Sequence, residues 1–390
     1  MPLSEALGGR LARPLTALVA VPGVDTAAMD GYAVAGAGPW RVVGHVLAGG
    51  APHAGALAAG EAVEIATGAP VPAGAEAVLP YEQALADGPW VDGPADAGRA
   101  GREPAGHGCG GRSRGERKAE AGRHIRRRGE DIAEGAVVLG AGTVVTPVAL
   151  GLAASLGHDR LWAWPRPRVS VLVTGDEVLR EGLPGPGRVR DAIGPFLPGL
   201  VEWAGGRVTD TTRLPDGAAP LGTALAPPPA GSGAARAEVV VVCGASSRGP
   251  ADHLRAVLAD LGADVLVDGV AVRPGHPQVL ARLPGGPPVV GLPGNPFAAL
   301  AAALTLLAPV LRAMTGRAAP RETSALAGQV RVHPRDTRLV PVRRTGRGAV
   351  AVGHDRPGSL WGAALADALA VVPPRWAGEQ VELIELPPGV

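Results

Sequence analysis

Three short runs of apolar, mostly β-branched residues constrain the fold of this chain more than any other feature. They read RVSVLVTG at residues 168–175, AEVVVVCG at 237–244 and PPVVGLPG at 287–294, and each ends in glycine. Segments with helical spacing of leucine and valine lie between them, such as ADHLRAVLADLGA at 251–263. Continuous apolar strands that alternate with helices predict a mainly parallel sheet covered by helices on both faces. We therefore expect a central three-layer α/β domain.

The segments on either side of this core follow a different pattern. A chain of 390 residues is long enough for roughly two to four domains. Residues 39–145 carry short alternating segments separated by Gly and Pro, which predict an inserted β-rich domain. Alternating segments return after the α/β domain at 168–317 and predict a C-terminal, barrel-like β domain at 318–390. The fold class we expect is multidomain α/β.

The charge balance and the cysteine content narrow the class of protein. Lys and Arg total 37 and Asp and Glu total 36, and this balance argues against a general nucleic-acid binder. The cysteines, Cys109 and Cys243, lack CxxC spacing and suit a reducing compartment. The first residues contain no apolar core of signal-peptide length. The apolar run from Phe297 contains Pro309 and Arg312, so we expect a core helix rather than a membrane span, in a cytoplasmic protein.

Two carboxylates follow directly on the first strand run. Thr174 and Gly175 end that run, and Asp176 and Glu177 come next. Parallel sheets bind ligands at the carboxyl ends of their strands, and paired carboxylates there can hold a divalent cation or act as acid and base. The alternative is that both residues begin a helix, where acidic side chains favour the positive end of the helix dipole. This motif alone leaves both interpretations open.

The other two strand ends carry residues that suit an anion. In GLPGNP, Asn295 is a good N-cap, Pro296 suits a first helical turn, and Gly294 lets backbone amides approach a ligand. Helix capping explains the Asn and the Pro equally well. The segment GASSRGPAD, which starts at Gly244, offers hydroxyls, amides and a cation to a phosphate, although it is not a P-loop. The sequence has no GxGxxG between a strand and a helix, which disfavours a dinucleotide dehydrogenase.

Two further charged segments have both a structural and a functional interpretation. VAVRPGHPQ places Arg273 and His276 around a Pro-Gly turn, as a candidate anion clamp or as a solvated loop. HIRRRGEDI places three arginines beside Glu130 and Asp131. Mixed charge at this density is typical of a salt-bridged surface turn, and a polar pocket for an oxyanion is the alternative.

A polar segment and a short motif are the remaining features of the sequence that bear on function. Residues 95–122 have almost no apolar periodicity and predict a flexible surface loop. A zinc site from His107, Cys109 and His124 would lack the paired spacing of such sites. The segment TAAMDGYAV, at residues 26–34, holds a Met and a Tyr around one Asp in a chain with only 3 Met and 2 Tyr, and by itself it predicts a turn with an exposed carboxylate.

Taken in order, these segments resemble the molybdopterin molybdenumtransferase family, which includes MoeA and gephyrin. TAAMDGYAV is similar to the family's SAMDGYA signature. EIATGAPVPAGAEAVLPYE, HIRRRGEDIAEG, RVSVLVTGDEVL, GLPGNP and RPGSLWGAALADALAVVP are similar to its other blocks. The resemblance covers most of residues 8–388, and the shared order of the blocks makes it specific.

The resemblance implies a homodimeric transferase at the last step of molybdenum cofactor synthesis. Such an enzyme takes adenylylated molybdopterin and molybdate, releases AMP and leaves the metal on the dithiolene, with Mg²⁺ assisting cleavage of the pyrophosphate bond. The central domain would be of the molybdopterin-binding type, and residues 1–38 with 146–167 would form a linker and dimerisation region. The segment TAAMDGYAV would reach the cleft across the subunit interface of a dimer. Other cofactor-synthesis proteins are implied as partners.

The resemblance also implies individual site residues. The implied catalytic residues are acidic, namely Asp30, Asp131, Asp176 and Glu177, and three of these, Asp30, Asp176 and Glu177, would hold the metal ion. The implied substrate-binding residues come from the matching blocks and the loops between them: Thr67, Thr174, Gly175, Asp191, Gly244, Ser246, Gly249, Asp252, Arg273, His276, Pro293, Gly294, Asn295, Pro296 and Ser359. Asp30 then becomes a site carboxylate whose direction Met29 and Tyr32 would fix by packing.

The chain departs from the family in three loops. GASSRGPAD stands where the family usually has GGVSVGDYD. The family's Asp-Ser-Asn block is Asp191-Ala192-Ile193 here, and the two lysines of its Lys-Pro-Gly-Lys-Pro loop are Arg273 and His276. We expect an active molybdenum insertase. The alternative is a diverged paralogue that binds pterin, nucleotide or a partner as a scaffold without turnover.

Overall fold

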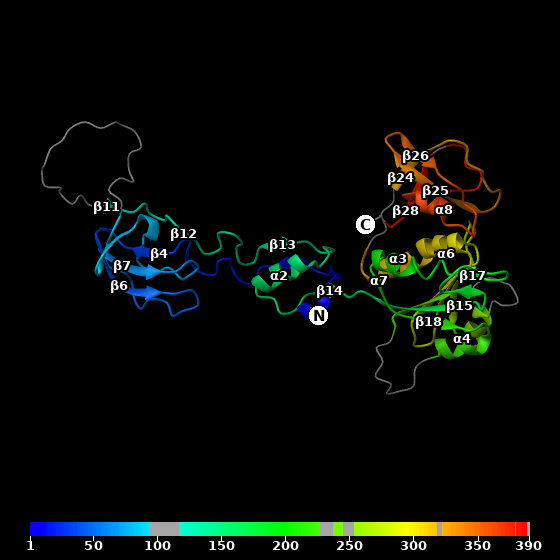
Figure 1. The fold of residues 1–390 in the computed structure, drawn as a ribbon, viewed down its shortest axis with the longest axis horizontal. Helices are drawn as coiled ribbons and strands as arrows, with labels where there is room; N and C mark the ends of the chain where they lie inside the picture. The colour runs from blue at the N-terminus through cyan, green and yellow to red at the C-terminus, as the bar shows by residue number, and fades with distance from the viewer. Residues whose placement is uncertain (94–116, 227–236, 245–252, 318–321, 379, 388–390) are drawn as a thin grey trace. The chain divides into compact units, whose positions relative to one another are not determined.

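The chain folds into two compact units. The computed structural model describes residues 1–93, 117–226, 237–244, 253–317, 322–378 and 380–387 (Figure 1). The first unit comprises Met1–Ser4 and Arg13–Leu161, and the second comprises Glu5–Ala12 and Trp162–Val390.

The first unit is built around a six-stranded sheet. The strand order is β8, β4, β7, β6, β10, β9, in which β6 and β7 are parallel and the other neighbours antiparallel. The strands are β4 (Gly31–Val34), β6 (Trp40–Val46), β7 (Glu61–Ile65), β8 (Ala77–Pro80), β9 (Leu85–Asp87) and β10 (Trp90–Asp92). Ala33 and Val63 belong to one buried cluster, and Val34 and Ala62 belong to another. Because alternate residues face opposite sides of a strand, both faces of this sheet are covered. The β-rich character predicted for residues 39–145 is confirmed, and the sheet also includes β4, which precedes that range.

Short elements accompany this sheet in the first unit. The strand pairs are β2 (Leu15–Thr16) with β13 (Val137–Leu139), β3 (Thr26–Ala27) with β12 (Ile125–Arg126), and β5 (Ala37–Gly38) with β11 (Arg117–Lys118). The helical elements are η1 (Tyr81–Gln83) and α2 (Pro147–Ser155), while α1 (Leu3–Ala6) spans the boundary between the units. The β3–β12 pair places Thr26 opposite Arg126. Two sequence blocks that lie a hundred residues apart along the chain, TAAMDGYAV and HIRRRGEDI, are therefore neighbours in space.

Gly31 allows β4 to approach β8 closely. A Cβ at this position would clash with the carbonyl oxygen of Leu79, a backbone atom that no side-chain rotation can move away. We expect Gly31→Ala to lower the free energy of unfolding by about 2 kcal/mol or more, as measured by urea denaturation. Gly140→Ala is the matched control, because a Cβ there meets nothing within 4 Å. An unchanged denaturation midpoint for Gly31→Ala would show that the two strands lie further apart.

The second unit contains the predicted α/β sheet. Its strand order is β18, β15, β19, β23, β22, β20. The first four strands are mutually parallel, and β22 is antiparallel to both of its neighbours. The strands are β15 (Arg168–Thr174), β18 (Arg207–Leu214), β19 (Val239–Cys243), β20 (Asp264–Asp268), β22 (Val279–Arg282) and β23 (Pro288–Leu292). The prediction of a mainly parallel sheet is confirmed.

Helices cover both faces of this sheet (Figure 1). Val171 and Val241 pack in one cluster with helices α3 and α6, whereas Leu172 and Val242 pack in another with α4 and α5. Neighbouring strand residues thus point into different layers. The helices are α3 (Leu197–Trp203), α4 (Ala218–Leu225), α5 (Leu254–Asp260), α6 (Pro296–Ala302) and α7 (Ala308–Met314), with the π-helical turn η2 (Ala303–Leu307) joining α6 to α7.

The apolar segment Pro296–Met314 is a core helix of this domain. It is the helix in the described part of the chain that is long and apolar enough to cross a membrane, but 67% of its most apolar window is buried inside the second unit. Phe297 and Leu307 are fully buried against the sheet. The expectation of a buried helix rather than a membrane span is confirmed.

The C-terminal strands of the second unit close into a small barrel. The closed order is β25, β26, β24, β28, β27 and back to β25. These strands are β24 (Glu322–Ala327), β25 (Thr337–Thr345), β26 (Gly348–Ala351), β27 (Ala368–Val372) and β28 (Gln380–Glu385), and α8 (Trp361–Leu365) lies between β26 and β27. A further short strand, β21 (Val272–Arg273), pairs with β25 and so ties the loop that follows β20 to the barrel. Two more short pairs complete the unit: β1 (Arg10–Leu11) with β14 (Ala163–Trp164), and β16 (Val178–Leu179) with β17 (Val189–Arg190).

Candidate active site

The carboxyl ends of three parallel strands meet closely in the second unit. The Thr174 hydroxyl, at the end of β15, donates a hydrogen bond to the carbonyl of Cys243 at the end of β19, at 3.1 Å. Gly244 follows with φ +102, and a Cβ there would lie 2.8 Å from the carbonyl oxygen of Thr174. Gly294, after β23, packs against Gly244 in turn. Glycines at these two strand ends therefore bring the backbone of three strands close together.

A cavity of about 530 Å³ opens at this edge of the sheet. We call it the strand-end cavity. Many residues predicted from the sequence line it: Thr174, Glu177, Asp191, Gly244, Gly294, Asn295 and Pro296. They come from the ends of β15, β17, β19 and β23, as expected for a ligand site of an open parallel sheet. Gly358, from the C-terminal block, also contributes to the lining.

Asp176 and Glu177 have different surroundings. Glu177 lines the strand-end cavity, and its carboxylate has no hydrogen-bond or ion-pair partner among the residues that the structure describes. Asp176 lies beside Asp216: the Asp176 amide donates to the Asp216 carboxylate at 3.1 Å, and the Asp216 amide faces the Asp176 carboxylate at 3.4 Å. The residues after Gly175 form a turn into β16, so the alternative that they begin a helix is wrong.

Asp216 lies next to Asp176, and it is not among the residues predicted from the sequence. It follows β18, just as Asp176 follows β15, and these two strands are adjacent and parallel. An acidic residue directly after an apolar or alternating strand was the available signal. The β18 pattern is mostly polar and exposed, so this strand was not recognised from its sequence.

Asp191 makes a dense set of contacts inside the chain. Its carboxylate accepts hydrogen bonds from the amides of Ile193 at 3.0 Å and Gly194 at 2.9 Å, and it also pairs with Arg213. The Asp191 side chain is only 9% exposed. These contacts hold the turn that leads into α3, while Ile193 enters the hydrophobic core. Burial, together with the Asp191 charge, raises the pKa of the Cys243 thiol to about 12, so this thiol is neither a nucleophile nor a metal ligand at neutral pH.

The start of α6 is occupied by the chain itself. The amides of Phe297 and Ala298 both point at the carbonyl of Pro357, at 2.8 and 3.3 Å. These amides are therefore not directed at an anion, contrary to the expectation for GLPGNP. Asn295 precedes the helix without a side-chain capping bond, so its amide group is available to a ligand.

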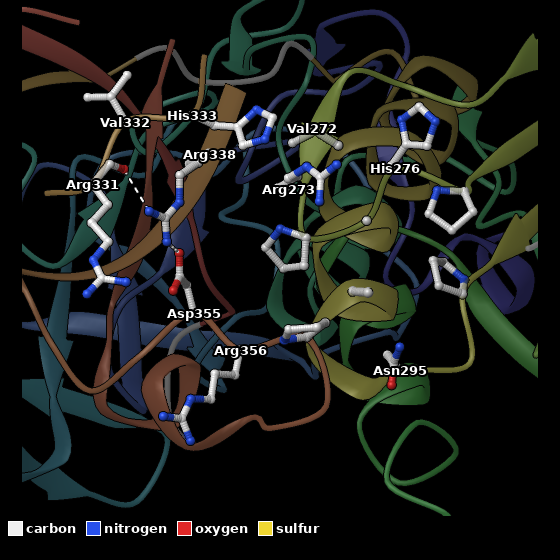
Figure 2. A pocket seen from close by; sticks show the side chains of 16 residues that line it. Val272, Arg273, His276, Asn295, Arg331, Val332, His333, Arg338, Asp355 and Arg356 are labelled. Carbon is white, nitrogen blue, oxygen red and sulfur yellow. Dashed lines mark hydrogen bonds and ion pairs between the residues drawn. The ribbon is translucent and has the colours of Figure 1, made fainter. Parts of the chain in front are cut away.

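A second cavity, of about 670 Å³, lies between residues 273–276, which we call the RPGH loop, and the C-terminal barrel (Figure 2). We call it the basic cavity. Four of the predicted residues line it: Arg273, His276, Pro293 and Asn295. The barrel and the segment before α8 add charged groups that were not predicted: Arg331, His333, Arg338, Asp355 and Arg356. Asn295 lines both cavities, so they adjoin each other.

Two of the arginines in the basic cavity are neutralised and two are not. Arg273 donates to Asp336 at 2.6 Å, and Arg338 pairs with Asp355 (Figure 2). The guanidinium groups of Arg331 and Arg356 have no ion-pair partner among the described residues. The basic cavity therefore carries uncompensated positive charge and suits an anion.

The RPGH loop is held rigidly in place. The fully buried Gln278 donates to the carbonyl of Gly275 at 2.9 Å and accepts from the Thr305 hydroxyl at 3.1 Å. A Cβ at Gly275 would lie 3.1 Å from the carbonyl of Ala298, so the loop packs directly on α6. His276 Nδ1 is 2.7 Å from the carbonyl of Val270 and donates to it.

In the first unit, the structure joins two of the predicted site residues. Asp30 Oδ1 accepts a hydrogen bond from the Thr67 amide at 2.6 Å and another from the Thr67 hydroxyl at 2.9 Å. The bond from the Thr67 amide, followed by the one from its hydroxyl, holds the pKa of the exposed Asp30 carboxyl below its usual value. Asp30 is therefore ionised at neutral pH.

Thr67 orients Asp30, and the neighbouring aromatic residues have other partners. Tyr32 packs edge-on against Tyr81, with ring centroids 5.4 Å apart. The Tyr81 hydroxyl donates to Glu64 at 2.7 Å, and burial followed by this bond raises the pKa of Tyr81. Met29 is 37% exposed. The Asp30 carboxylate is thus held by hydrogen bonds from the block EIATGAPVP rather than by packing alone.

The arginines of HIRRRGEDI form a salt-bridged surface. Arg126 pairs with Asp131, Arg127 with Asp25 at 2.6 Å, and Arg128 with Glu134 at 2.6 Å. Hydrogen bonds from the Arg128 amide and the Arg127 side chain hold the pKa of Asp25 below its usual value. The structural interpretation of this segment accounts for all three cations.

Some predicted residues take no part in either cavity or cannot be placed. Ser359 accepts a hydrogen bond from the Trp361 amide at 3.3 Å at the start of α8, and it lines neither cavity. Ser246, Gly249 and Asp252 lie outside the described residues, as does most of the 95–122 segment with His107 and Cys109.

The donor set at the strand ends fits a hard cation only with help from a ligand. Within the described ranges, no three His, Cys, Asp or Glu side chains gather closely enough to hold a metal ion. Mg²⁺ is usually bound by one or two carboxylates together with substrate phosphates and water. Glu177, which lines the strand-end cavity, and Asp176, which precedes it in the chain, are two carboxylates of this kind.

The fold and the two cavities define an α/β protein with adjoining cavities at the carboxyl edge of its sheet, one of which carries uncompensated positive charge. Comparison with known proteins narrows this class. Residues 1–157 match the family model described as MoeA N-terminal region (domain I and II), and residues 170–313 match the one described as probable molybdopterin binding domain. The chain belongs to the molybdopterin molybdenumtransferase family.

Individual relatives agree with this assignment. Molybdopterin molybdenumtransferase 2 of Mycobacterium tuberculosis (strain ATCC 25618 / H37Rv) is 35% identical over 331 residues, which cover 81% of this chain and 75% of the relative. Molybdopterin molybdenumtransferase of Synechococcus elongatus is 32% identical over 326 residues, covering 80% and 74%. The solved structure of the molybdopterin biosynthesis moea protein from Pyrococcus horikosii superposes with a TM-score of 0.71 at 25% identity, covering 100% of this chain and 94% of that one.

Proposed function

We propose that this chain inserts molybdenum into molybdopterin in the synthesis of the molybdenum cofactor. The reaction takes adenylylated molybdopterin and molybdate, and it releases AMP. The observation that carries this proposal is the pair of adjoining cavities that share Asn295, one lined by a free carboxylate and the other by free guanidinium groups. Adenylylated molybdopterin and molybdate differ in shape and charge, so each substrate needs its own binding cavity.

The two cavities have separate tasks in this proposal. The strand-end cavity takes the pterin nucleotide, with glycine backbone at 244 and 294 allowing close approach. The basic cavity takes molybdate, a tetrahedral dianion, between Arg331, Arg356, Arg273 and His276. Asn295, exposed between the cavities, contacts both substrates. Holding them in adjoining sites makes their reaction effectively intramolecular.

Mg²⁺ is the proposed cofactor of the pyrophosphate cleavage. Glu177 and Asp176 would hold it, together with phosphate oxygens of the substrate and water, and the ion would supply neutralisation of phosphate charge. The Glu177 carboxylate faces the cavity without a partner among the described residues, whereas Asp176 is oriented by the amide bonds that it exchanges with Asp216. Asp30, fixed by Thr67 and ionised, is a further acidic group of the same reaction.

A homodimer and a cytoplasmic location complete the proposal. The first unit exposes apolar side chains near its N-terminus and around α2: Leu18 is 52% exposed, Val148 80% and Val137 64%. Exposed apolar residues of this kind are typical of protein interfaces. Analytical ultracentrifugation is expected to give twice the monomer mass, and Val148→Asp should shift the equilibrium toward the monomer.

Reconstitution of the reaction tests the proposed function. Purified protein, adenylylated molybdopterin, molybdate and Mg²⁺ should release AMP and restore activity to a molybdoenzyme that lacks its cofactor. If the protein binds the pterin nucleotide tightly but releases no AMP, it is a binding paralogue rather than an insertase. If the protein binds neither substrate, it is neither an insertase nor a binding paralogue, and the proposal is wrong.

The two free arginines of the basic cavity give a direct prediction about molybdate. We expect Arg331→Gln and Arg356→Gln each to weaken molybdate binding by about tenfold at low salt, because each removes a charge-assisted hydrogen bond to a dianion. Isothermal titration calorimetry measures this. Arg347→Gln is the matched control, because Arg347 is an exposed arginine of the same barrel that lies outside the cavity. Equal losses in all three variants would mean that only net charge matters.

A further inference from the structure

One buried side-chain amide has no part in the proposed reaction. Gln278 follows the RPGH loop by two residues and is fully buried. A buried polar group is costly unless its hydrogen bonds are made. Gln278 Nε2 donates to the Gly275 carbonyl at 2.9 Å, and Gln278 Oε1 accepts from the Thr305 hydroxyl at 3.1 Å. Both ends of the amide therefore have partners that suit a donor and an acceptor.

Thr305, the second partner of this amide, lies in the π-helical turn η2 that joins α6 to α7. Its hydroxyl also lies 2.8 Å from the Ala301 carbonyl, so its one proton is shared between that carbonyl and Gln278. Single π-helical turns are uncommon within α-helices and occur frequently at functional sites. The Gln278 amide thus joins an irregular turn of the core helix to the RPGH loop.

The RPGH loop is supported from two sides. On the barrel side, β21 pairs with β25, and Arg273 donates to Asp336 at 2.6 Å. On the helix side, Gly275 lies against α6, because a Cβ there would be 3.1 Å from the Ala298 carbonyl. Gln278 holds the carbonyl of the same Gly275. Without this amide, the loop would keep its barrel support and lose a hydrogen bond on the helix side.

The position of this loop decides the shape of the basic cavity. Arg273 and His276 line the cavity from the loop, whereas Asn295 lines it from the start of α6. Gln278 lines neither the basic cavity nor the strand-end cavity. It can therefore affect a ligand only through the residues that it holds in place. A displacement of binding groups by about 1 Å can cost as much as about a hundredfold in rate.

We propose, on the basis of the proposed function, that Gln278 and Thr305 are positioning residues for molybdate. Their buried hydrogen bonds hold the RPGH loop against α6, so the residues that line the basic cavity are in place before molybdate binds. No residue of the loop lines the strand-end cavity, so binding of the pterin nucleotide does not depend on this pair.

Steady-state kinetics on the intact protein tests the positioning role. Gln278→Met keeps the size of the side chain and removes both hydrogen bonds. We expect its KM for molybdate to rise by about tenfold or more, with kcat and the KM for adenylylated molybdopterin within about twofold of the wild type. The double variant Gln278→Met/Thr305→Val should be no worse than Gln278→Met, because the two residues act as one unit.

Two changes at Thr305 provide a milder variant and its conservative counterpart. Thr305→Val removes the bond to Gln278 Oε1, and we expect the KM for molybdate to rise by about threefold. Thr305→Ser keeps the hydroxyl and should have the wild-type KM. If Gln278→Met does not fold, the comparison between Thr305→Val and Thr305→Ser makes the same test.

Hydrogen exchange measures the loop independently of the reaction. Backbone amides of residues 269–276 should exchange about tenfold faster in Gln278→Met than in the wild type. Thr315→Val is the matched control. Thr315 is a buried threonine whose hydroxyl donates to the carbonyls of Leu311 and Arg312 in α7, so its loss should change neither the KM for molybdate nor exchange in the loop.

The results that would overturn the positioning role are distinct. Unchanged exchange in Gln278→Met would show that the amide does not hold the loop. Faster exchange with an unchanged KM for molybdate would show that the position of the loop does not affect binding. Equal losses in kcat and in the affinity for both substrates would show a general structural effect. Each of these results leaves an active wild type, whereas a wild type that releases no AMP overturns the proposed function itself.

Discussion

Replacing Asp30 with asparagine is expected to lower the rate of AMP release by about a hundredfold to ten-thousandfold, which is the range for loss of a catalytic acid or base. The change keeps the shape of the side chain and removes its charge. Asp30 Oδ1 accepts two hydrogen bonds from Thr67. The other oxygen, Oδ2, has no partner among the described residues and is available to a ligand. A free oxygen on an oriented, ionised carboxylate is what a catalytic role requires.

The lowered pKa of Asp30 determines how this prediction depends on pH. Because the Thr67 bonds favour the charged form, Asp30 stays ionised down to a pH below the usual range for aspartate. Its contribution to the rate should therefore be constant through neutral pH and disappear only in strong acid. Thr67→Val removes the hydroxyl bond and keeps the amide bond, so we expect a smaller loss, of about tenfold.

Glu61→Gln is the matched control for Asp30. Glu61 begins β7, which pairs with β4, the strand that directly follows Asp30. Its carboxylate accepts a hydrogen bond from the Ala58 amide at 3.0 Å, and chiefly that bond lowers its pKa. It has no predicted part in the reaction, so its replacement should leave AMP release unchanged. If Asp30→Asn and Glu61→Gln behave alike, or if Asp30→Asn unfolds the first unit, Asp30 is a structural residue and its proposed role is wrong.

Replacing Glu177 with glutamine is expected to cost about a thousandfold in the rate of AMP release and to raise the Mg²⁺ concentration needed for half-maximal rate. Glu177 is exposed at the mouth of the strand-end cavity, and no cation of the described chain neutralises it. Its charge is therefore available to a metal ion or to the reacting phosphate. The rate of AMP release measured against Mg²⁺ concentration separates loss of metal affinity from loss of chemistry.

Glu181→Gln provides the comparison on the same segment. Glu181 is exposed between β16 and β17, outside the lining of the strand-end cavity. The control should show wild-type rates and wild-type Mg²⁺ dependence. A normal rate in Glu177→Gln would exclude this carboxylate from the reaction. A low rate with normal Mg²⁺ dependence would keep it in the reaction but remove it from the metal site.

The local pattern of the chain determined the α/β core and its ligand-binding edge. The runs at 168–175, 237–244 and 287–294 are apolar on both faces, so they had to be buried as central strands, and the residues after them had to lie at one edge. Thr174, Glu177 and Gly244 could therefore be placed at the strand-end cavity before the fold was known. The alternation of the C-terminal segments predicted a β domain, and the pairing of β25 with β27 closes it into a barrel.

The pairings that complete the site were decided by tertiary structure. Asp30 and Thr67 are 37 residues apart, and nothing in either segment indicates which partner it has. Asp216 follows a strand whose polar, exposed sequence gave no strand signal. In the sequence, Arg331, Arg338 and Arg356 look like ordinary surface residues. They line a cavity because β21 pairs with β25 and places the RPGH loop beside them.

The amides at the start of α6 are a case in which the sequence pattern predicted a ligand contact that the fold does not make. GLPGNP predicts an N-terminal anion site, but the carbonyl of Pro357 takes the amides of Phe297 and Ala298. A local pattern states which hydrogen bonds a segment is able to make. Which partner satisfies them depends on a segment some sixty residues further along the chain, because only the packed fold sets the distance between them. The sequence by itself thus determined the sheet and the position of its ligand-binding edge, and the tertiary structure decided which charges face the ligand there.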